Sequence, residues 1–544
     1  MRVSLTALSL AVSFWLVAFD NRVFWRGIWA ALEPASARSV LSVGLLALSL
    51  WLLFGLIVRL LCSRWTAKPV ATVLLIVAAL AAYFIEAYGI VIDRGMVRNV
   101  FGTDRREAAD LLTAPLFWDL AWRGLLPVAL LCMVRIERTS WRDAALGVAG
   151  QAAAVAVVLG VAATSFFAEY ASMARNHREL RHVLTPTNVV NGLAGLWKER
   201  AKAPRELTMV AQDAMRTEPK SRAKPLVVVL VVGETARAAS FSLGGYERPT
   251  NDALDGKGVV YFGNTTACGT DTATSLPCMF SNLGATGFAA STVVSRENVL
   301  DVLARTGIGV RWLENNSGCK GVCDWVDTQT LSQSEQPGVC DAGECLDAVL
   351  VDGLRDALAK TSSDSLLALH MRGSHGPAYF KRVPASARRY TPTCDTRQIQ
   401  NCDLQALRNT YDNSIVYTSQ TLAQLIDELA VRADVFDSAL LYVSDHGESL
   451  GEKGVYLHGM PKWMAPREQT HVPMLVWLSE GAEARLGIER LALEGASRGS
   501  YSHDNLFHTL LGAFALKTDS YRPEMDLLER ARIRPRPLAG AESK

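Results

Sequence analysis

The first third of the chain is dominated by long apolar segments, whereas the rest alternates between short apolar runs and polar stretches. Five segments are each close to the roughly 20 residues that a helix needs to cross a membrane. They lie at about 4–19, 40–62, 70–91, 117–134 and 144–167. This pattern predicts five transmembrane helices. The first segment could instead be a cleaved signal peptide, but no small-residue cleavage site stands out, and Phe14-Trp15 is typical of an interface anchor.

The pattern changes near residue 225. Leu226–Val232 is a continuous apolar run rich in β-branched residues, as is typical of a buried parallel strand. Similar runs occur at Gly309–Leu313, Leu366–Leu369, Ala439–Val443 and Met474–Leu478, and helical stretches lie at Val299–Arg305, Ala348–Leu358 and Ser414–Ala430. This alternation predicts an α/β sandwich with a mostly parallel sheet.

These patterns divide the 544 residues into three parts. We predict a transmembrane domain at 1–167, bridging helices and a linker at 168–224, and an α/β domain at 225–544. The middle part is polar with short amphipathic patches, so we expect it to lie near the membrane surface.

Loop charges predict the orientation. The loop between the second and third spans contains Arg64 and Lys68. The loop between the fourth and fifth spans contains Arg135, Arg138 and Arg142. The positive-inside rule places both loops in the cytoplasm. The α/β domain then lies on the far side of the membrane. The loop 93–107 breaks this rule, because it faces the far side yet is rich in arginine, including Arg105 and Arg106. It is either a solvated connector or a site for anionic lipid head groups.

Cysteine spacing agrees with that orientation. Eight of the ten cysteines form four pairs of near neighbours, Cys268/Cys278, Cys319/Cys323, Cys340/Cys345 and Cys394/Cys402. Such pairs predict short disulfide loops in an oxidising compartment. Zinc fingers are the alternative, but the spacings are irregular and no paired histidines accompany them. The net charge of +2 gives no support for a nucleic-acid partner.

A stretch between two cysteines is a candidate for catalysis. Thr270, Thr272 and Thr274 lie between Cys268 and Cys278, and a disulfide-closed loop would hold a hydroxyl group in one place. The residues alone leave open which threonine supplies the reacting oxygen.

Candidate metal ligands follow two of the predicted strands. Glu234 comes after the first strand, and Asp445-His446 comes after the fourth. Because α/β sheets bind ligands beyond the carboxyl ends of their strands, these side chains should meet. Two carboxylates, an imidazole and a threonine oxygen are an acceptable ligand set for Zn²⁺. Zinc lowers the pKa of bound water by roughly 8–9 units, and a bound alcohol should shift similarly. Glu448 and Glu452 are better suited to supporting roles.

Several motifs resemble, in the same order, those of the lipid A phosphoethanolamine transferases, a family that includes the mobile colistin-resistance enzymes and belongs to the alkaline phosphatase/sulfatase superfamily. The motifs are Glu234-Thr-Ala-Arg, Cys268-Gly-Thr-Asp-Thr272-Ala-Thr-Ser-Leu-Pro-Cys278, Asn315-Asn316-Ser-Gly-Cys319-Lys320, Gly373-Ser-His375-Gly-Pro and Ser444-Asp-His-Gly-Glu-Ser-Leu-Gly-Glu. The resemblance covers nearly the whole chain. It implies an α-helical membrane domain of five transmembrane helices plus an α/β/α sandwich catalytic domain of alkaline phosphatase/sulfatase type.

The resemblance also assigns roles. It implies that Thr272 is the nucleophile and that Glu234, Asp445 and His446 join it as ligands of one tightly bound zinc. The residues that match substrate-binding positions are Asn99, Thr103, Glu107, Asn316, Lys320, His375 and His458. His375 and His458 also match a second, weaker zinc site. For the other histidines of the soluble part, His370, His471, His503 and His508, we predict structural roles.

By this resemblance the protein transfers phosphoethanolamine from phosphatidylethanolamine to lipid A of lipopolysaccharide through a phosphoethanolamine-threonine intermediate, which lowers affinity for polymyxins such as colistin. It implies a multi-pass protein of the bacterial inner membrane, with its catalytic domain in the periplasm. The partners are then membrane lipids, not nucleic acid, and we expect a monomer.

Other functions remain open on the sequence. The acceptor could be a sugar of the lipopolysaccharide core or another periplasmic glycan. A phosphatase or sulfatase is a second possibility, although the Cys/Ser-X-Pro-X-Arg motif of sulfatases is not apparent around Thr272. A membrane-anchored binding module without activity is a third, and the intact Glu/Thr/Asp/His set argues against it.

Overall fold

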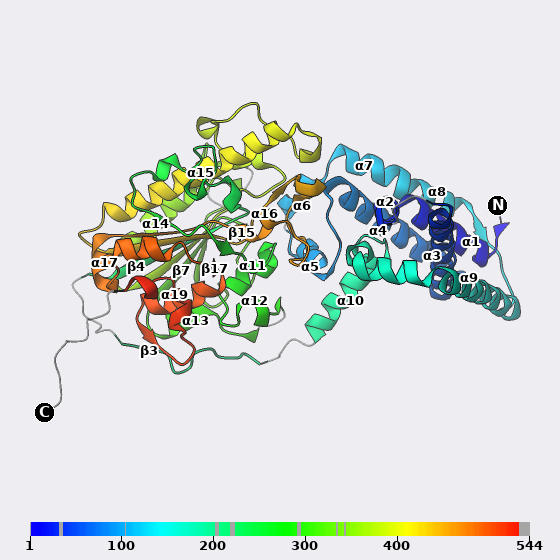
Figure 1. The fold of residues 1–544 in the computed structure, drawn as a ribbon, viewed down its shortest axis with the longest axis horizontal. Helices are drawn as coiled ribbons and strands as arrows, with labels where there is room; N and C mark the ends of the chain where they lie inside the picture. Colours follow the sequence, from blue (N-terminus) through cyan, green and yellow to red (C-terminus); the bar gives the residue numbers. More distant parts are fainter. Residues whose placement is uncertain are drawn as a thin grey trace. The chain divides into compact units, whose positions relative to one another are not determined.

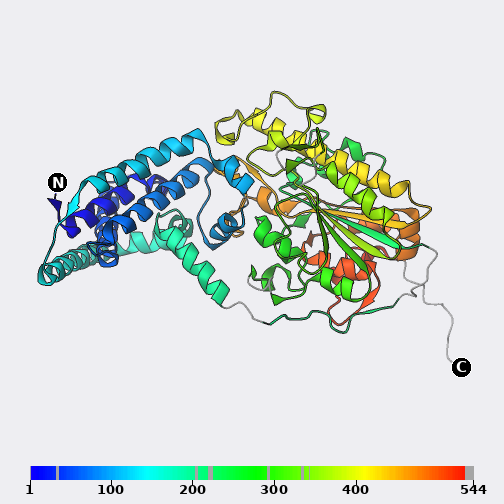
Figure 2. The same ribbon diagram turned by 180° about the vertical axis from the view of Figure 1, so that it is seen from behind.

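The computed structural model describes residues 2–31, 36–103, 105–201, 206–217, 224–290, 295–332, 336–341 and 344–532. The chain divides into two compact units, one made of Met1–Val100 and Leu111–Lys198, the other of Phe101–Asp110 and Glu199–Lys544. The segment Phe101–Asp110, between two predicted spans, thus belongs to the second unit. Figures 1 and 2 trace the chain from both sides. Parts of the predicted linker, 202–205 and 218–223, lie outside the described residues.

The first unit is helical. Within the described residues, four helices are long and apolar enough to cross a membrane: α3 (Ala37–Leu61), α4 (Ala67–Tyr88), the run Ala114–Met133 and α9 (Trp141–Asn176). A fifth candidate is the bent pair of α1 (Leu5–Phe19) and α2 (Arg22–Ala31), which meet at 62°. The prediction of five spans matches the count in which this pair is one span. In the 18-residue stretch of α9 that is most apolar, only 11% is buried inside the protein, so most of the apolar surface of this helix is available to lipid.

The second unit is built on a seven-stranded sheet in the order β5-β16-β12-β4-β11-β7-β8. The strands are β5 (Val260–Tyr261), β16 (Met474–Leu478), β12 (Asp437–Ser444), β4 (Leu226–Gly233), β11 (Ser365–His370), β7 (Gly309–Glu314) and β8 (Asp327–Thr330). Five strands from β12 to β8 run parallel, and β16 runs against its two neighbours. The predicted, mostly parallel sheet is confirmed.

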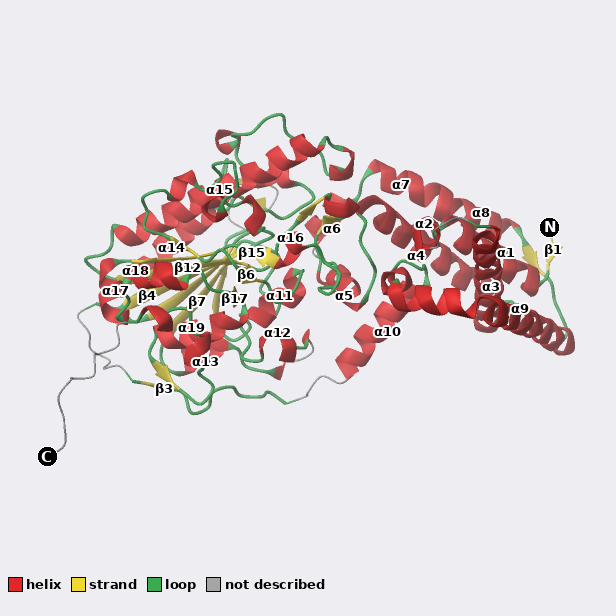
Figure 3. Cartoon of the chain, in the orientation of Figure 1, coloured by secondary structure: helices red, strands yellow, loops and turns green. Residues whose placement is uncertain are grey.

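Burial explains why the central strand forms. All eight residues of β4 are buried, and Val228, Leu230 and Val232 pack in one core with Phe280 and Trp312. Helices α14 (Val349–Ala359) and α15 (Leu404–Ala430) cover one face of the sheet, while α13 (Val299–Arg305) and α19 (Asp504–Ala513) cover the other (Figures 1 and 3). The unit is therefore an α/β/α sandwich.

All four predicted cysteine pairs are bonded as disulfides: Cys268–Cys278, Cys319–Cys323, Cys340–Cys345 and Cys394–Cys402. The first two pairs each have a carboxylate close by, but their sulfurs are oxidised and so do not serve as thiolate ligands. The zinc-finger alternative is thereby removed for these cysteines. Cys62 and Cys132 carry free thiols, in the apolar helical unit.

Candidate active site

The site forms where parallel strands end side by side. Strands β4, β12 and β11 stop at the same edge of the sheet, where Gly233 pairs with Ser444 and His370 pairs with Val232, and the chain after each strand supplies polar side chains. Glu234 therefore lies next to Asp445 and His446, as the sequence predicted. Thr235 adopts a left-handed φ of 58°, a conformation that non-glycine residues rarely adopt and that is common at functional sites.

Thr272 completes the cluster. Its Oγ1 lies 3.2 Å from Glu234 Oε2 and 3.3 Å from His446 Nε2. His446 Nε2 in turn lies 3.3 Å from Glu234 Oε1 and 3.4 Å from Asp445 Oδ2. Glu234, Asp445 and His446 are fully buried, whereas Thr272 is only half-buried. The hydroxyl is thus close to the candidate ligand atoms and belongs to a residue that is partly exposed.

Local structure explains why Thr272 is the threonine that reaches the cluster. It is the first residue of α11 (Thr272–Met279), whose N-terminus is capped by the Asp271 side chain accepting from Thr274 N at 2.9 Å. Thr270 donates its hydroxyl to Met460 O at 2.6 Å and is buried. The positive end of the α11 dipole favours negative charge on an oxygen at Thr272.

The charges of the cluster are strongly coupled. Burial opposes ionisation of Glu234, but the hydrogen bond and charge of His446 outweigh it and hold the pKa of this carboxyl well below its usual range. Burial and the charge of Glu234 raise the pKa of Asp445 to about 6. Burial opposes protonation of His446, yet the two carboxylates raise its pKa to about 10. Two buried carboxylates beside one imidazole therefore favour a positive charge at this point.

The donor set fits a metal ion. Glu234, Asp445 and His446 each offer one ligand atom, and these atoms lie within 4.8 Å of one another. Asp445 Oδ2 is buried and accepts no hydrogen bond from any described residue. A buried carboxylate oxygen without a donor is costly unless a cation satisfies it. Oxygen and imidazole ligands of this kind match Zn²⁺.

Asn316, which follows the end of β7, contacts the cluster. Its Nδ2 donates to Glu234 Oε2 at 2.7 Å and lies 3.3 Å from His370 Nε2. His370 Nδ1 is 3.0 Å from Glu314 Oε2, and both residues are buried. Sequence reasoning missed Glu314 and treated His370 as structural. Their positions at the ends of β7 and β11 are the signal that could have found them, because a side chain at that edge faces the site.

A second pair of histidines lies beside the first cluster. The ring of His458 is 4.4 Å from that of His446 and 5.5 Å from that of His375. Glu448 Oε2 accepts from His458 Nδ1 at 2.8 Å, and Tyr379 donates its hydroxyl to the other oxygen. The supporting role predicted for Glu448 fits this contact. Burial lowers the pKa of His375 well below its usual value, so its ring is neutral and able to bind a metal.

The remaining substrate-binding candidates occupy several places. Glu107, on α6 (Arg105–Leu111), has its Oε1 3.8 Å from His375 Nε2. Lys320 Nζ donates to Ser317 O at 3.0 Å, one residue from Asn316. Thr103 precedes α6 in the same unit, whereas Asn99 belongs to the helical unit, on α5 (Arg94–Gly102).

The Cys394–Cys402 disulfide has its contacts with α15 and with the loop that leads into it, not with the cluster. Cys394 is buried, and its backbone N–H donates to Thr410 Oγ1 at 2.6 Å. Cys402 is only partly buried, and its backbone N–H donates to Ile399 O at 3.2 Å, two residues before α15 begins at Leu404. Cys402 therefore closes a loop at the start of a helix. Its predicted bond to Cys394 is confirmed, and its role is structural.

Three histidines have contacts that fit the predicted structural roles. His503 Nδ1 accepts from Cys268 N at 3.1 Å and its Nε2 donates to Ser444 O at 2.9 Å. His471 Nε2 donates to Gly263 O at 2.8 Å, and His508 Nδ1 accepts from a backbone N–H at 3.2 Å. These contacts fix loops around the sheet and leave the rings no part in the cluster. Glu452 likewise pairs with Arg237 at 2.7 Å.

Comparisons with known proteins identify the family of the chain. Residues 227–516 match the family model described as sulfatase, and residues 50–201 match the one described as phosphoethanolamine transferase EptA/EptB. The phosphoethanolamine transferase EptA of Escherichia coli K12 is 38% identical, with 97% of each chain covered. The phosphatidylethanolamine transferase Mcr-1 of E. coli is 37% identical, with 96% of each covered.

A solved structure agrees as well. The integral membrane lipooligosaccharide phosphoethanolamine transferase A (EptA) of Neisseria meningitidis superposes with a TM-score of 0.94 at 34% identity, covering 98% of this chain and all of that one. Both the helical unit and the α/β unit are thus shared with a protein whose fold is known.

Proposed function

Since the chain belongs to the EptA family of phosphoethanolamine transferases, we propose that it transfers phosphoethanolamine from phosphatidylethanolamine to lipid A, with Thr272 as nucleophile. The observation that carries this assignment is the position of Thr272 Oγ1, 3.2 Å from Glu234 Oε2 and 3.3 Å from His446 Nε2. A threonine hydroxyl is otherwise a weak nucleophile, and here it lies among groups that can take its proton and hold a metal.

The first step forms a bond between Thr272 Oγ1 and the phosphorus of phosphatidylethanolamine. The bond from phosphorus to the glycerol oxygen breaks, and diacylglycerol leaves with the proton that Thr272 gives up. Half-burial of Thr272 admits the donor, while the buried neighbours fix the hydroxyl for attack.

The second step returns Thr272 to its starting state. A protonated phosphate oxygen of lipid A attacks the phosphorus held on Thr272, the bond from phosphorus to Oγ1 breaks, and the threonine oxygen takes up the proton that the lipid A phosphate gives up. Because Thr272 begins α11, the helix dipole favours the negative charge on its oxygen in both steps.

Glu234, Asp445, His446 and Thr272 would hold one tightly bound Zn²⁺. When bound, zinc lowers the pKa of a coordinated oxygen and neutralises charge on the phosphoryl group. His375 and His458 would hold either a second, weaker zinc or the phosphoethanolamine group, and the neutral ring of His375 suits a metal. We assign Asn99, Thr103, Glu107 and Lys320 to substrate binding on the same resemblance.

The protein is proposed to act as a monomer in the bacterial inner membrane, with the α/β unit in the periplasm. The four or five candidate spans and the four disulfides support this location, because disulfides persist in oxidising compartments. Addition of an amine to lipid A would lower its affinity for cationic polymyxins.

The test compares two threonines of helix α11. Thr272→Ala should leave the protein folded, with zinc bound at reduced affinity, and should abolish modified lipid A in mass spectra of cells that express it. Thr274→Ala, two residues along α11, should preserve the modification. Normal modification by the Thr272 variant would refute the assignment. Free phosphoethanolamine without a modified acceptor would instead indicate a hydrolase.

A further inference from the structure

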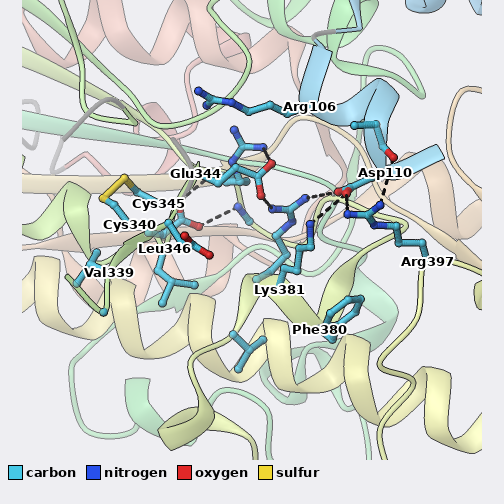
Figure 4. A pocket seen from close by; sticks show the side chains of 18 of the residues that line it. Arg106, Asp110, Val339, Cys340, Glu344, Cys345, Leu346, Phe380, Lys381 and Arg397 are labelled. Atoms are coloured by element: carbon cyan, nitrogen blue, oxygen red, sulfur yellow. Dashed lines mark hydrogen bonds and ion pairs between the residues drawn. A yellow bond between two sulfur atoms is a disulfide. The ribbon is translucent and has the colours of Figure 1, made fainter. Parts of the chain in front are cut away.

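A polar pocket of about 600 Å³ lies in the α/β unit, outside the metal-ligand cluster (Figure 4). Its walls come from α6, from the Cys340–Cys345 disulfide loop and from the segment after β11. The volume is within the range of about 300–1,000 Å³ that small-molecule sites occupy. We call it the polar pocket.

The lining of the polar pocket has more positive than negative side chains. Six arginines or lysines face four carboxylates, a surplus of two positive charges. The excess of positive charge is clear at Asp110. Its single carboxylate forms ion pairs with Arg397 at 2.9 Å, Lys381 at 3.1 Å and Arg382 at 3.7 Å (Figure 4). Glu344 likewise serves both Arg372 at 3.3 Å and Arg382 at 3.1 Å. Two carboxylates thus neutralise only two of these four cations.

Arg372 points to a missing anion. Its side chain is only 3% exposed, and its Nε has no hydrogen-bond partner among the described residues. A buried guanidinium N–H without an acceptor is costly, so an acceptor from a ligand would be stabilising. A phosphate monoester carries about −1.5 to −2 charges near pH 7, which matches the surplus in the pocket. Arginine also binds phosphate oxygens through two parallel hydrogen bonds.

The polar pocket adjoins the metal-ligand cluster and its neighbouring histidines through two segments. Arg372 and Gly373 line the pocket, and a Cβ on Gly373 would lie 2.5 Å from Glu234 O. Ser374 N donates to that same carbonyl at 3.0 Å. On α6, Asp110 faces the pocket, while Glu107, one turn earlier, lies 3.8 Å from His375. A ligand with two anionic groups could therefore occupy both places.

We propose that the polar pocket binds a phosphate of the acceptor glycolipid other than the phosphate that reacts, with Lys381, Arg397 and Arg372 as its ligands. This inference rests on the proposed function, since it assumes a phosphorylated sugar lipid as acceptor. The half-buried ring of Phe380, also on the wall, offers an apolar surface for a sugar (Figure 4). The donor fits less well, because its phosphodiester carries one negative charge that its own ammonium group balances.

The experiment uses full-length enzyme in detergent micelles. Initial transfer rates are measured against bisphosphorylated lipid A at fixed phosphatidylethanolamine, and then against the donor at fixed acceptor. The double variant Lys381→Gln/Arg397→Gln should raise the acceptor KM about 10- to 100-fold, because two charged hydrogen bonds are lost. The donor KM and the zinc content should stay within twofold. Arg355→Gln, which breaks surface ion pairs to Asp352 and Glu428, is the matched control.

Acceptor chemistry gives a second readout. With wild-type enzyme, the KM for monophosphorylated lipid A should be higher than the KM for bisphosphorylated lipid A. The double variant should not raise the KM for monophosphorylated lipid A further, because this acceptor lacks the phosphate that the pocket holds. Inorganic phosphate should compete with bisphosphorylated lipid A in the wild type and only weakly in the double variant.

Several outcomes would overturn the proposal. An unchanged acceptor KM in a folded double variant would do so, as would an equal rise in the donor KM. Tight competition by inorganic phosphate, together with an acceptor KM indifferent to the second phosphate, would mark a site for free phosphate. If the double variant fails to fold, the single variant Arg397→Gln, whose side chain is 36% exposed, replaces it. Failure of the proposed function would look different, because wild-type enzyme would then modify no lipid A.

Discussion

The segment Arg372–Ser374 connects the polar pocket, which Arg372 and Gly373 line, to the metal-ligand cluster, where Ser374 N donates to Glu234 O, yet the two regions differ in the sign of their net charge. The cluster places two buried carboxylates around one imidazole and so attracts a cation. The polar pocket has two more cations than carboxylates and so attracts an anion. One segment of chain thus lies between the proposed site of phosphoryl transfer and the proposed site for a second phosphate.

The two regions also differ in exposure. Glu234, Asp445 and His446 have no exposed surface, so loss of one charge cannot be compensated by water. Lys381 and Arg397 in the polar pocket are about one-third exposed, and solvent screens their charges. Substitutions in the cluster should therefore have larger effects than substitutions in the pocket.

The largest effect is expected at Asp445, a proposed metal ligand. Asp445→Asn removes one of two buried carboxylates and should lower zinc affinity and transfer by at least about 100-fold, since changes to groups that merely support a ligand cost about 10–100-fold. Zinc content by elemental analysis and lipid A mass spectra would measure this. Asp427→Asn, a surface carboxylate paired with Lys257, serves as control. A fully zinc-loaded, active Asp445 variant would contradict the ligand assignment.

A substitution of Asn316 tests whether this residue mainly positions Glu234 or mainly binds the substrate. Because its Nδ2 donates to Glu234 Oε2, Asn316→Ala should weaken zinc binding and lower kcat about 10- to 100-fold. The donor KM should change little. A raised KM with normal zinc affinity would instead return Asn316 to the substrate-binding role that the family resemblance implies. Asn401→Ala, at an exposed turn, is the control.

The places of the strands could be predicted because burial dictates them, although four of the five predicted runs are one or two residues short at an end. Met474–Leu478 and Val299–Arg305 form the predicted strand and helix without change of bounds, since the first is an apolar run between Pro473 and Ser479 and the second begins after the cap residue Asn298. Glu234 and Asp445 were found by the same logic, as the first polar residues after buried strands. Helix α15 begins at Leu404 instead of Ser414, because its first turns carry polar residues that form buried hydrogen bonds and hide the apolar period.

The polar pocket could not be predicted, because its parts are far apart in the sequence. Asp110 lies more than 200 residues before Lys381, and only the fold of the second unit brings them to 3.1 Å. Strand β8 was missed because Asp327–Thr330 is exposed and has no apolar pattern. The sequence did indicate that Arg106 belonged to an arginine-rich loop with lipid contacts as one explanation, and that residue lines the pocket.

A smaller effect concerns acid stability near the cluster. Burial lowers the pKa of His503 to about 3, whereas an unfolded histidine titrates near 6.5. Above pH 6.5 the ring is neutral in both states. As the pH falls from 6.5 towards 3, only the unfolded chain takes up the proton, so folding loses stability, about 2 kcal/mol by pH 5. His503→Gln should therefore show a flatter dependence of the unfolding midpoint on pH between 7.5 and 5. An unchanged slope would show that His503 is not the group responsible.

The smallest effect is expected at the exposed edge of the polar pocket. It tests whether removal of a carboxylate has opposite effects on binding in the pocket and in the cluster. Asp341 is an exposed carboxylate on the pocket lining. Removing a carboxylate from the cluster weakens cation binding, but Asp341→Asn should strengthen anion binding and lower the acceptor KM about two- to fivefold at low salt, since exposed charges interact weakly. The gain should vanish near 1 M salt, where the screening length falls to about 3 Å. A raised acceptor KM in this variant would mean that the pocket does not attract the acceptor through its positive charge.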